Sequence, residues 1–125
     1  MSTNRDTGRM GEFLASYILE TYGIEVHHVD RAGADLWCKT NTAIITVQVK
    51  SARQAARSND HTQATYYNYT TKNPNADWYC FVALDRQLLL MRPTAEITTT
   101  TVRIAPSEFN EANQRRTVEE LLKPT

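Results

Sequence analysis

The segment from Gly33 to Ser51 constrains the fold more than any other part of the chain. It reads GADLWCKTNTAIITVQVKS, with an acidic residue, Asp35, near its start. Its second half alternates apolar and polar residues, which is the period of a strand with one buried face. The apolar set is Ile45, Val47 and Val49, and the polar set is Thr46, Gln48 and Lys50. Because polar residues 39–42 separate the two halves, the segment predicts a β-hairpin.

The predicted hairpin brings Asp35 beside Gln48 and Lys50. A carboxylate, an amide oxygen and an ammonium group at one place can hold a divalent cation and a phosphate. Magnesium prefers oxygen ligands, often one or two carboxylates together with water and substrate. We therefore predict Asp35, Gln48 and the main-chain carbonyl of Val49 as metal ligands. Lys50 is predicted to touch the scissile phosphate or to orient the attacking water.

Residues before the hairpin predict a helix. Asp6 or Thr7 can cap it, and Gly23 is placed to end it just after Tyr22. Apolar residues recur there at spacings of three and four, which predicts one buried stripe. The stripe is Met10, Phe13, Leu14, Tyr17, Ile18 and Leu19. Glu12 lies next to this stripe and is a candidate second carboxylate ligand, acting directly or through water.

The rest of the chain predicts further strands and a closing helix. The other predicted strands cover residues 24–29, 78–84, 87–91 and 98–104, the last of them at a sheet edge. Residues 52–69 are polar and then aromatic, and we expect an irregular or mobile segment across the open face of the sheet. A turn is expected at 73–76, and Ser107 is expected to cap a last helix that ends at Leu122. This order predicts one α/β domain over residues 1–125, a mixed sheet flanked by helices.

The charge balance gives no general nucleic-acid signal. The chain has 14 basic and 14 acidic residues, whereas nucleic-acid-binding domains usually carry a basic surface. The stretch from Lys50 to Lys72 is different, since it holds four basic residues and one acidic residue, Asp60. Arg53 and Arg57 in this stretch are candidate contacts to a phosphate backbone.

Three tyrosines follow the basic stretch. Tyr66, Tyr67 and Tyr69 can stack on DNA or hydrogen-bond to it, and their alternation also suits a half-buried strand. The histidines show no spacing typical of a zinc site. The cysteines, Cys38 and Cys80, lie far apart without a CxxC motif and are predicted to be reduced core thiols.

No segment of the sequence resembles a targeting or membrane signal. The N-terminus is polar, and no apolar run approaches the roughly 18 residues that span a bilayer. We expect a cytoplasmic protein with no membrane partner.

The motifs together resemble the PD-(D/E)xK nuclease superfamily. They are Glu12 on a helix, GADL at 33–36, and QVKSA at 48–52. The pattern is similar to the archaeal-type Holliday junction resolvases and to the bacterial and phage group that contains group I intron homing endonucleases. The resemblance covers roughly residues 8–52 and implies a restriction-endonuclease-like mixed sheet of four or five strands. It also implies DNA cleavage with Mg²⁺, or Mn²⁺, by a homodimer or homotetramer.

Two positions depart from the superfamily pattern. Ala34 replaces the proline that names the motif, and that residue shapes the turn without binding metal. Gln48 replaces the usual acidic residue, and its neutral amide oxygen holds a metal less tightly. The Gln-bearing homing branch is therefore the better fit. The same departure keeps open an alternative function, that of a catalytically inactive DNA-binding or regulatory module. The DNA target can be a branched structure or a specific site.

Overall fold

The computed structural model describes residues 4–31, 34–57, 65–72 and 75–123. The predicted loop residue Gly33, the predicted turn residues Asn73 and Pro74, and His61 lie outside the described residues. Within the described ranges the helices are α1 (Asn4–Thr21) and α2 (Glu111–Leu122), with short 3-10 helices η1 (Thr94–Glu96) and η2 (Pro106–Glu108). The strands are β1 (Glu25–Arg31), β2 (Ala34–Lys39), β3 (Ile44–Ala52), β4 (Ala56–Arg57), β5 (Thr65–Thr70), β6 (Trp78–Ala83), β7 (Leu88–Pro93) and β8 (Thr101–Ile104).

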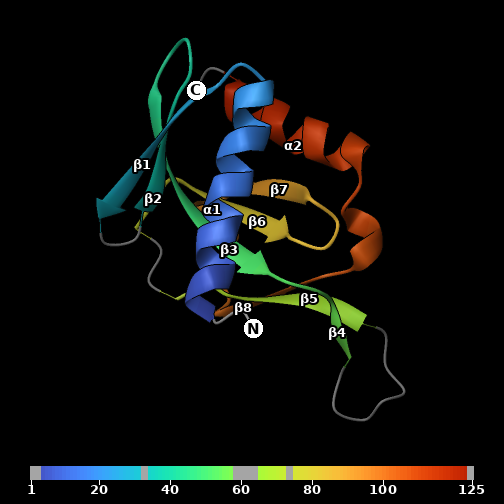
Figure 1. The fold of residues 1–125 in the computed structure, drawn as a ribbon. Coiled ribbons are helices and arrows are strands. Elements are labelled where there is room, and N and C mark those ends of the chain that lie inside the picture. Colours follow the sequence, from blue (N-terminus) through green and yellow to red (C-terminus); the bar gives the residue numbers. More distant parts are fainter. Residues whose placement is uncertain (1–3, 32–33, 58–64, 73–74, 124–125) are drawn as a thin grey trace.

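The strands form two sheets (Figure 1). The larger has the order β1-β2-β3-β6-β7, and the smaller has the order β4-β5-β8. Strands β3 and β6 are parallel, whereas the other neighbours in the larger sheet are antiparallel. The predicted fold class, a mixed sheet flanked by helices, is confirmed. The predicted β-hairpin is formed by β2 and β3.

Each face of the larger sheet has its own apolar core. We call the face under α1 and α2 the helix face, where residues such as Leu36, Val47 and Cys80 are fully buried. On the other face, which we call the site face, β5 and β8 bury Tyr79 and Phe81 of β6. The smaller sheet thus packs on the β6–β7 side of the site face.

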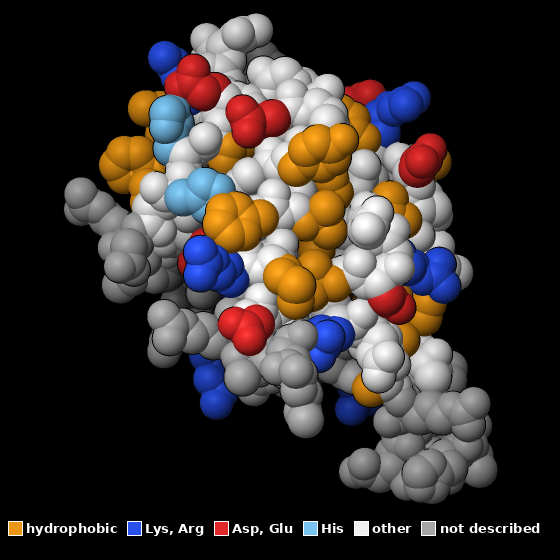
Figure 2. Space-filling view, viewed as in Figure 1, with side chains coloured by type: hydrophobic (Ala, Val, Ile, Leu, Met, Phe, Trp, Pro, Cys, Tyr) orange, Lys and Arg blue, Asp and Glu red, His pale blue; other side chains and the backbone are white. Residues whose placement is uncertain are grey.

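The first helix buries a different stripe from the one that its hydrophobic residues predict. Ala15, Ile18 and Leu19 are buried against the sheet, as expected for the last two. Met10, Phe13 and Tyr17 are instead 42%, 55% and 69% exposed, and hydrophobic side chains gather along α1 in Figure 2. The reason is the close approach of helix and strand at Gly11, which turns the larger residues outward.

Gly11 rests directly on β3. A Cβ atom at position 11 would lie 1.6 Å from Oγ and 2.7 Å from Cβ of Ser51, closer than non-bonded atoms can be. The helix can therefore approach β3 this closely only with glycine at this position. At the other end of α1, Gly23 has a φ of 85°, which confirms its predicted role in ending the helix.

Two predicted segments are wrong. Part of the stretch predicted to be irregular is the strand β5, because Tyr67 and Tyr69 alternate into the core and β5 pairs with β8. The last helix is capped by Asn110, whose side chain accepts a hydrogen bond from the Asn113 N–H, and the predicted cap Ser107 lies in η2. No helix in the described ranges is long and apolar enough to cross a membrane.

The glycines of α1 allow a matched test of this packing. Gly11→Ala should lower the free energy of unfolding by about 1–3 kcal/mol, since helix and strand must separate to admit the methyl group. Gly8→Ala should raise it by up to about 1 kcal/mol, because the added Cβ meets no atom within 4 Å and alanine favours helix. Denaturant unfolding measures both variants. Equal effects of the two substitutions would contradict the close contact.

Candidate functional site

The hairpin register places Asp35 and Gln48 on the site face. Leu36 pairs with Val47, and both side chains point into the helix-face core. Because successive side chains alternate, Asp35 and Gln48, one step further along each strand, point to the opposite face. The ladder ends at Leu36 and Val47, so Asp35 and Gln48 are the first residues beyond it on their two strands.

The main chain of Val49 holds the Asp35 carboxylate at the point where the ladder between β2 and β3 ends. Its N–H donates a hydrogen bond to Oδ2 of Asp35 over 2.8 Å. The N–H and C=O groups of a strand residue point to the same side, as in a hydrogen-bonded pair. The carbonyl of Val49 therefore points toward β2 and Asp35. Asp35 and the Val49 main chain therefore meet at this point, and Gln48 directly precedes Val49 on β3.

The amide of Gln48 provides an independent test of whether a metal fits this place. Its Oε1 atom is buried and makes no hydrogen bond with the described residues, and the same holds for the hydroxyl of Tyr79, its neighbour on β6. A buried acceptor without a partner is unfavourable by about 1–3 kcal/mol. A magnesium ion accepts such a carbonyl oxygen as a ligand. The donor set of Asp35, Gln48 and Val49 therefore fits the metal that the sequence predicts.

The electrostatics of Asp35 reflect its half-buried position. Burial raises the pKa of the carboxyl above its ordinary value, and the Val49 N–H and the Lys50 ammonium oppose that shift. The Lys50 side chain is half-buried and shares the site face with Gln48, since the two pair with Phe81 and Tyr79 of β6. Lys50 is thus close enough to act on the charge of Asp35.

Glu12 lies on α1, next to the contact between Gly11 and β3. Glu12 is half-buried, and its helix packs on the helix face, whereas Asp35 and Gln48 point to the site face. Its main-chain carbonyl accepts a hydrogen bond from the Ser16 hydroxyl. In the described part of the chain no three His, Cys, Asp or Glu residues are grouped as a metal site. The role of Glu12 as a second carboxylate ligand stays a prediction.

The candidate DNA contacts are dispersed by the fold. Arg53 follows β3 and lines a groove with Met10 and Leu14 of α1, so it does not share the site face with Asp35. Only the main chain of Arg57, in β4, is described. Both arginines stay predicted phosphate contacts.

The tyrosine prediction is wrong for two of the three residues. Tyr67 is 1% and Tyr69 3% exposed, and their hydroxyls donate to Asp85 and to the Val82 carbonyl. They pack the core between the two sheets, where DNA cannot reach them. Tyr66 alternates with them and is half-buried, so its predicted contact with DNA stays open.

The remaining reactive side chains have structural partners. Cys38 and Cys80 are free and buried, as predicted, and burial raises the pKa of Cys38 to about 12. His28 hydrogen-bonds Ser16 on the helix face, and His27 contacts Glu25 on the site face.

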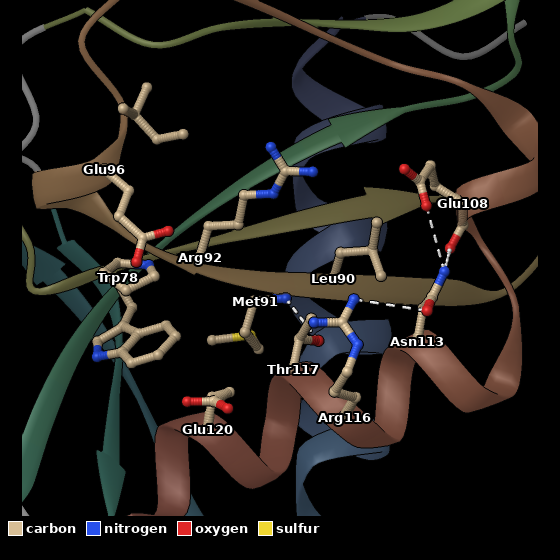
Figure 3. A pocket seen from close by; sticks show the side chains of 12 residues that line it. Trp78, Leu90, Met91, Arg92, Glu96, Glu108, Asn113, Arg116, Thr117 and Glu120 are labelled. Carbon is tan, nitrogen blue, oxygen red and sulfur yellow. Dashed lines mark hydrogen bonds between the residues drawn. The ribbon is translucent and has the colours of Figure 1, made fainter.

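A separate cavity lies away from these residues (Figure 3). It has a volume of about 360 Å³ between β7, η1 and α2, and it contains none of the predicted site residues. Arg92 and Arg116 extend into it together with Glu96 and Glu120, so its charges have both signs.

The sequence reasoning missed part of the site face. Trp37 follows Asp35 by two residues on β2 and therefore points the same way. Together with Ile44 and His27 it lines a hollow of about 430 Å³ on β1, β2 and β3. The alternation of β2 was the available signal, because it puts Asp35, Trp37 and Lys39 on one face.

The arrangement of strands and helices matches a known fold. The fold is similar to that of a bacterial homing endonuclease. The solved structure of I-Ssp6803I matches with a TM-score of 0.68 and 17% sequence identity, over 84% of this chain and 77% of that chain. No protein-family model and no curated protein matches the sequence. At this identity the likeness establishes the fold.

The raised pKa of Asp35 predicts that this residue lowers the stability of the folded protein at neutral pH. The folded protein binds this proton more tightly than the unfolded chain, so Asp35 lowers stability as pH rises from its ordinary pKa to its raised one. Asp35→Asn should therefore melt at a higher temperature than the unsubstituted protein at pH 7. The difference should shrink toward the ordinary pKa of Asp, near 4.

Glu119→Gln, an exposed change on α2, is the control and should show no such difference. Melting curves between pH 3 and pH 8 measure all three proteins. A lower melting temperature for Asp35→Asn at pH 7 would contradict the assigned environment.

Proposed function

We propose that the protein is a metal-dependent DNA endonuclease of the PD-(D/E)xK type, with Asp35, Gln48, Val49 and Lys50 at its active site. One observation carries the proposal. The Val49 N–H fixes the Asp35 carboxylate next to β3, where the preceding residue, Gln48, has a buried Oε1 without a hydrogen-bond partner among the described residues, within a fold similar to that of a homing endonuclease.

The chain's own groups have distinct roles in the proposed reaction. Asp35, Gln48 and the Val49 carbonyl would hold Mg²⁺ or Mn²⁺, and Glu12 would add a second carboxylate directly or through water. Bound there, the metal supplies charge neutralisation of the phosphate and a water of lowered pKa. Lys50 contacts the scissile phosphate or orients the attacking water as a compact positive charge. Arg53 and Arg57 contact the phosphate backbone, which positions DNA without reading its sequence.

The proposed enzyme acts as a homodimer or homotetramer. The exposed stripe of Met10, Phe13 and Tyr17 on α1 supports self-association, because these are three of the four large hydrophobic residues that are exposed in the described ranges. Its substrate is branched DNA or a specific duplex site. Cutting of branched DNA needs no separate sequence-reading module, and recognition of a specific site would be shared between subunits.

Cleavage assays test the proposal. Supercoiled plasmid, linear duplex, flap and four-way junction DNA are each incubated with Mg²⁺, Mn²⁺ or Ca²⁺. We expect cleavage with Mg²⁺ or Mn²⁺, and a loss of at least about 100-fold in Asp35→Asn and Lys50→Ala, in line with removal of a charge that stabilises the transition state. Glu119→Gln and Lys123→Ala, two exposed changes on and after α2, should retain full activity.

The inactive-module alternative predicts a different outcome. In that case no DNA is cut with any metal, DNA is still bound, and Asp35→Asn leaves that binding unchanged. Such a result would overturn the enzyme proposal.

Gln48 allows a test of metal ligation that does not need turnover. Gln48→Met keeps the length of the side chain and removes the unpartnered oxygen, so it should raise the free energy of unfolding by about 1 kcal/mol or more. It should also weaken Mg²⁺ binding at least tenfold in calorimetric titration. Gln48→Glu should retain or strengthen binding, because it restores a charged oxygen ligand. A loss of stability in Gln48→Met would contradict the unpartnered state of the amide.

A further inference from the structure

A hollow on the site face lies directly beside the proposed active site. It has a volume of about 430 Å³ and is lined by Glu25, His27, Val29, Trp37, Lys39 and Ile44. These residues come from β1, β2 and the start of β3, the strands that carry Asp35 and Gln48. The smaller sheet packs on the other side of the site face, over β6 and β7.

The hollow and the proposed active site are continuous along β2. Trp37 and Asp35 are two residues apart on one strand and point to the same face, so their Cα atoms are separated by about 7 Å. Trp37 pairs with Thr46, two residues before Gln48 on β3. A nucleotide whose phosphate lies at Asp35 and Gln48 therefore reaches Trp37 with its own or the adjacent base.

The chemistry of the hollow suits a nucleobase. Its apolar lining includes an aromatic side chain, Trp37, and an aliphatic one, Ile44, which is 62% exposed. Its rim is polar, with the ammonium of Lys39 and the hydrogen-bonded pair of His27 and Glu25, whose side-chain atoms lie 2.6 Å apart. A base needs an aromatic surface for its ring and polar groups for its edge, and it carries a phosphate that Lys39 can attract.

A base inside a duplex cannot enter such a hollow, since its faces are stacked and its edge is paired. Entry requires a base that is already unpaired, or one that is turned out of the helix at an energetic cost. The hollow is therefore selective for DNA with an unpaired nucleotide beside the scissile phosphate.

We propose that the Trp37 hollow binds one unpaired nucleobase next to the scissile phosphate, so that the substrate is branched, flapped or bulged DNA rather than continuous duplex. The inference rests on the proposed function for the position of the phosphate. It assigns Trp37 as the stacking surface, with Ile44 as its diagonal neighbour on β3.

Binding measurements test this assignment without turnover. Two DNA duplexes are compared in Ca²⁺, one fully paired and one with a single unpaired 2-aminopurine at the centre. In the unsubstituted protein we expect tighter binding of the second duplex, together with quenching of 2-aminopurine fluorescence by the indole ring. Trp37→Ala should weaken that binding by about tenfold or more and abolish the quenching, as expected for the loss of one stacked base. Binding of the paired duplex should change less than twofold.

Further variants separate stacking from folding. Trp37→Phe retains an aromatic ring and should stay within about threefold of the unsubstituted affinity. Ile44→Ser changes a largely exposed side chain and should weaken only the unpaired substrate. Trp78→Phe alters the other tryptophan, which lies outside the hollow, and should change the binding affinity for neither DNA. Equal losses for both DNAs, or unchanged binding in Trp37→Ala and Ile44→Ser, would overturn the inference. The inference would also be overturned if a second copy of the chain occupied the hollow. In that case Ile44→Ser would sediment as a smaller oligomer than the unsubstituted protein.

The two proposals can fail separately. If Mg²⁺-dependent cleavage is found and Trp37→Ala has no selective effect, only the hollow is misassigned. If no cleavage is found and Trp37→Ala still weakens only the unpaired substrate, the base site stands and the nuclease proposal fails.

Discussion

The hydrogen bond from the Val49 N–H to the Asp35 carboxylate is the interaction on which the rest of the site depends. It forms just beyond the last residue pair of the ladder between β2 and β3. The Val49 N–H therefore donates to the side chain of Asp35 instead of to a main-chain carbonyl of β2. The bond fixes the Asp35 carboxylate against β3, and the Val49 carbonyl points to the same side of that strand as its N–H. On the other face Val49 packs against the core that α1 covers, and Gly11 allows α1 to reach β3 there. Core packing and the position of the carboxylate are therefore linked through one strand.

Two features of the site are also unfavourable for the stability of the folded protein. The half-buried Asp35 has a raised pKa, and Gln48 has a buried oxygen that finds no hydrogen-bond partner in the part of the chain that the structure describes. Both features lower the stability of the folded protein, and a bound cation relieves both at once, because it favours the charged carboxylate and accepts the amide oxygen. Perturbed groups of this kind concentrate at functional sites. The chemistry of the donors and the fold thus point to the same place on the molecule.

Whether a feature could be predicted from the sequence depends on how far apart in the chain its interacting residues lie. The hairpin and the common face of Asp35 and Gln48 depend on alternation and a local turn, so they could be predicted. The buried stripe of α1 could not, because its closest contact is made by Gly11, which carries no hydrophobic signal. The strand β5 was also missed, since its partner β8 follows about 30 residues later in the chain. The burial of Tyr67 and Tyr69 depends on that pairing. The burial of the Gln48 oxygen away from any hydrogen-bond partner in the described ranges is a property of the packed structure and has no signature in the sequence.

The central claim is that Asp35, Gln48 and Val49 bind a divalent cation. Anomalous diffraction from a crystal soaked in Mn²⁺ tests it most directly, because it locates the ion without any assumption about activity. We predict one strong peak at about 2.0–2.4 Å from a carboxylate oxygen of Asp35 and from Oε1 of Gln48. A peak elsewhere, or none at millimolar Mn²⁺, would contradict the account.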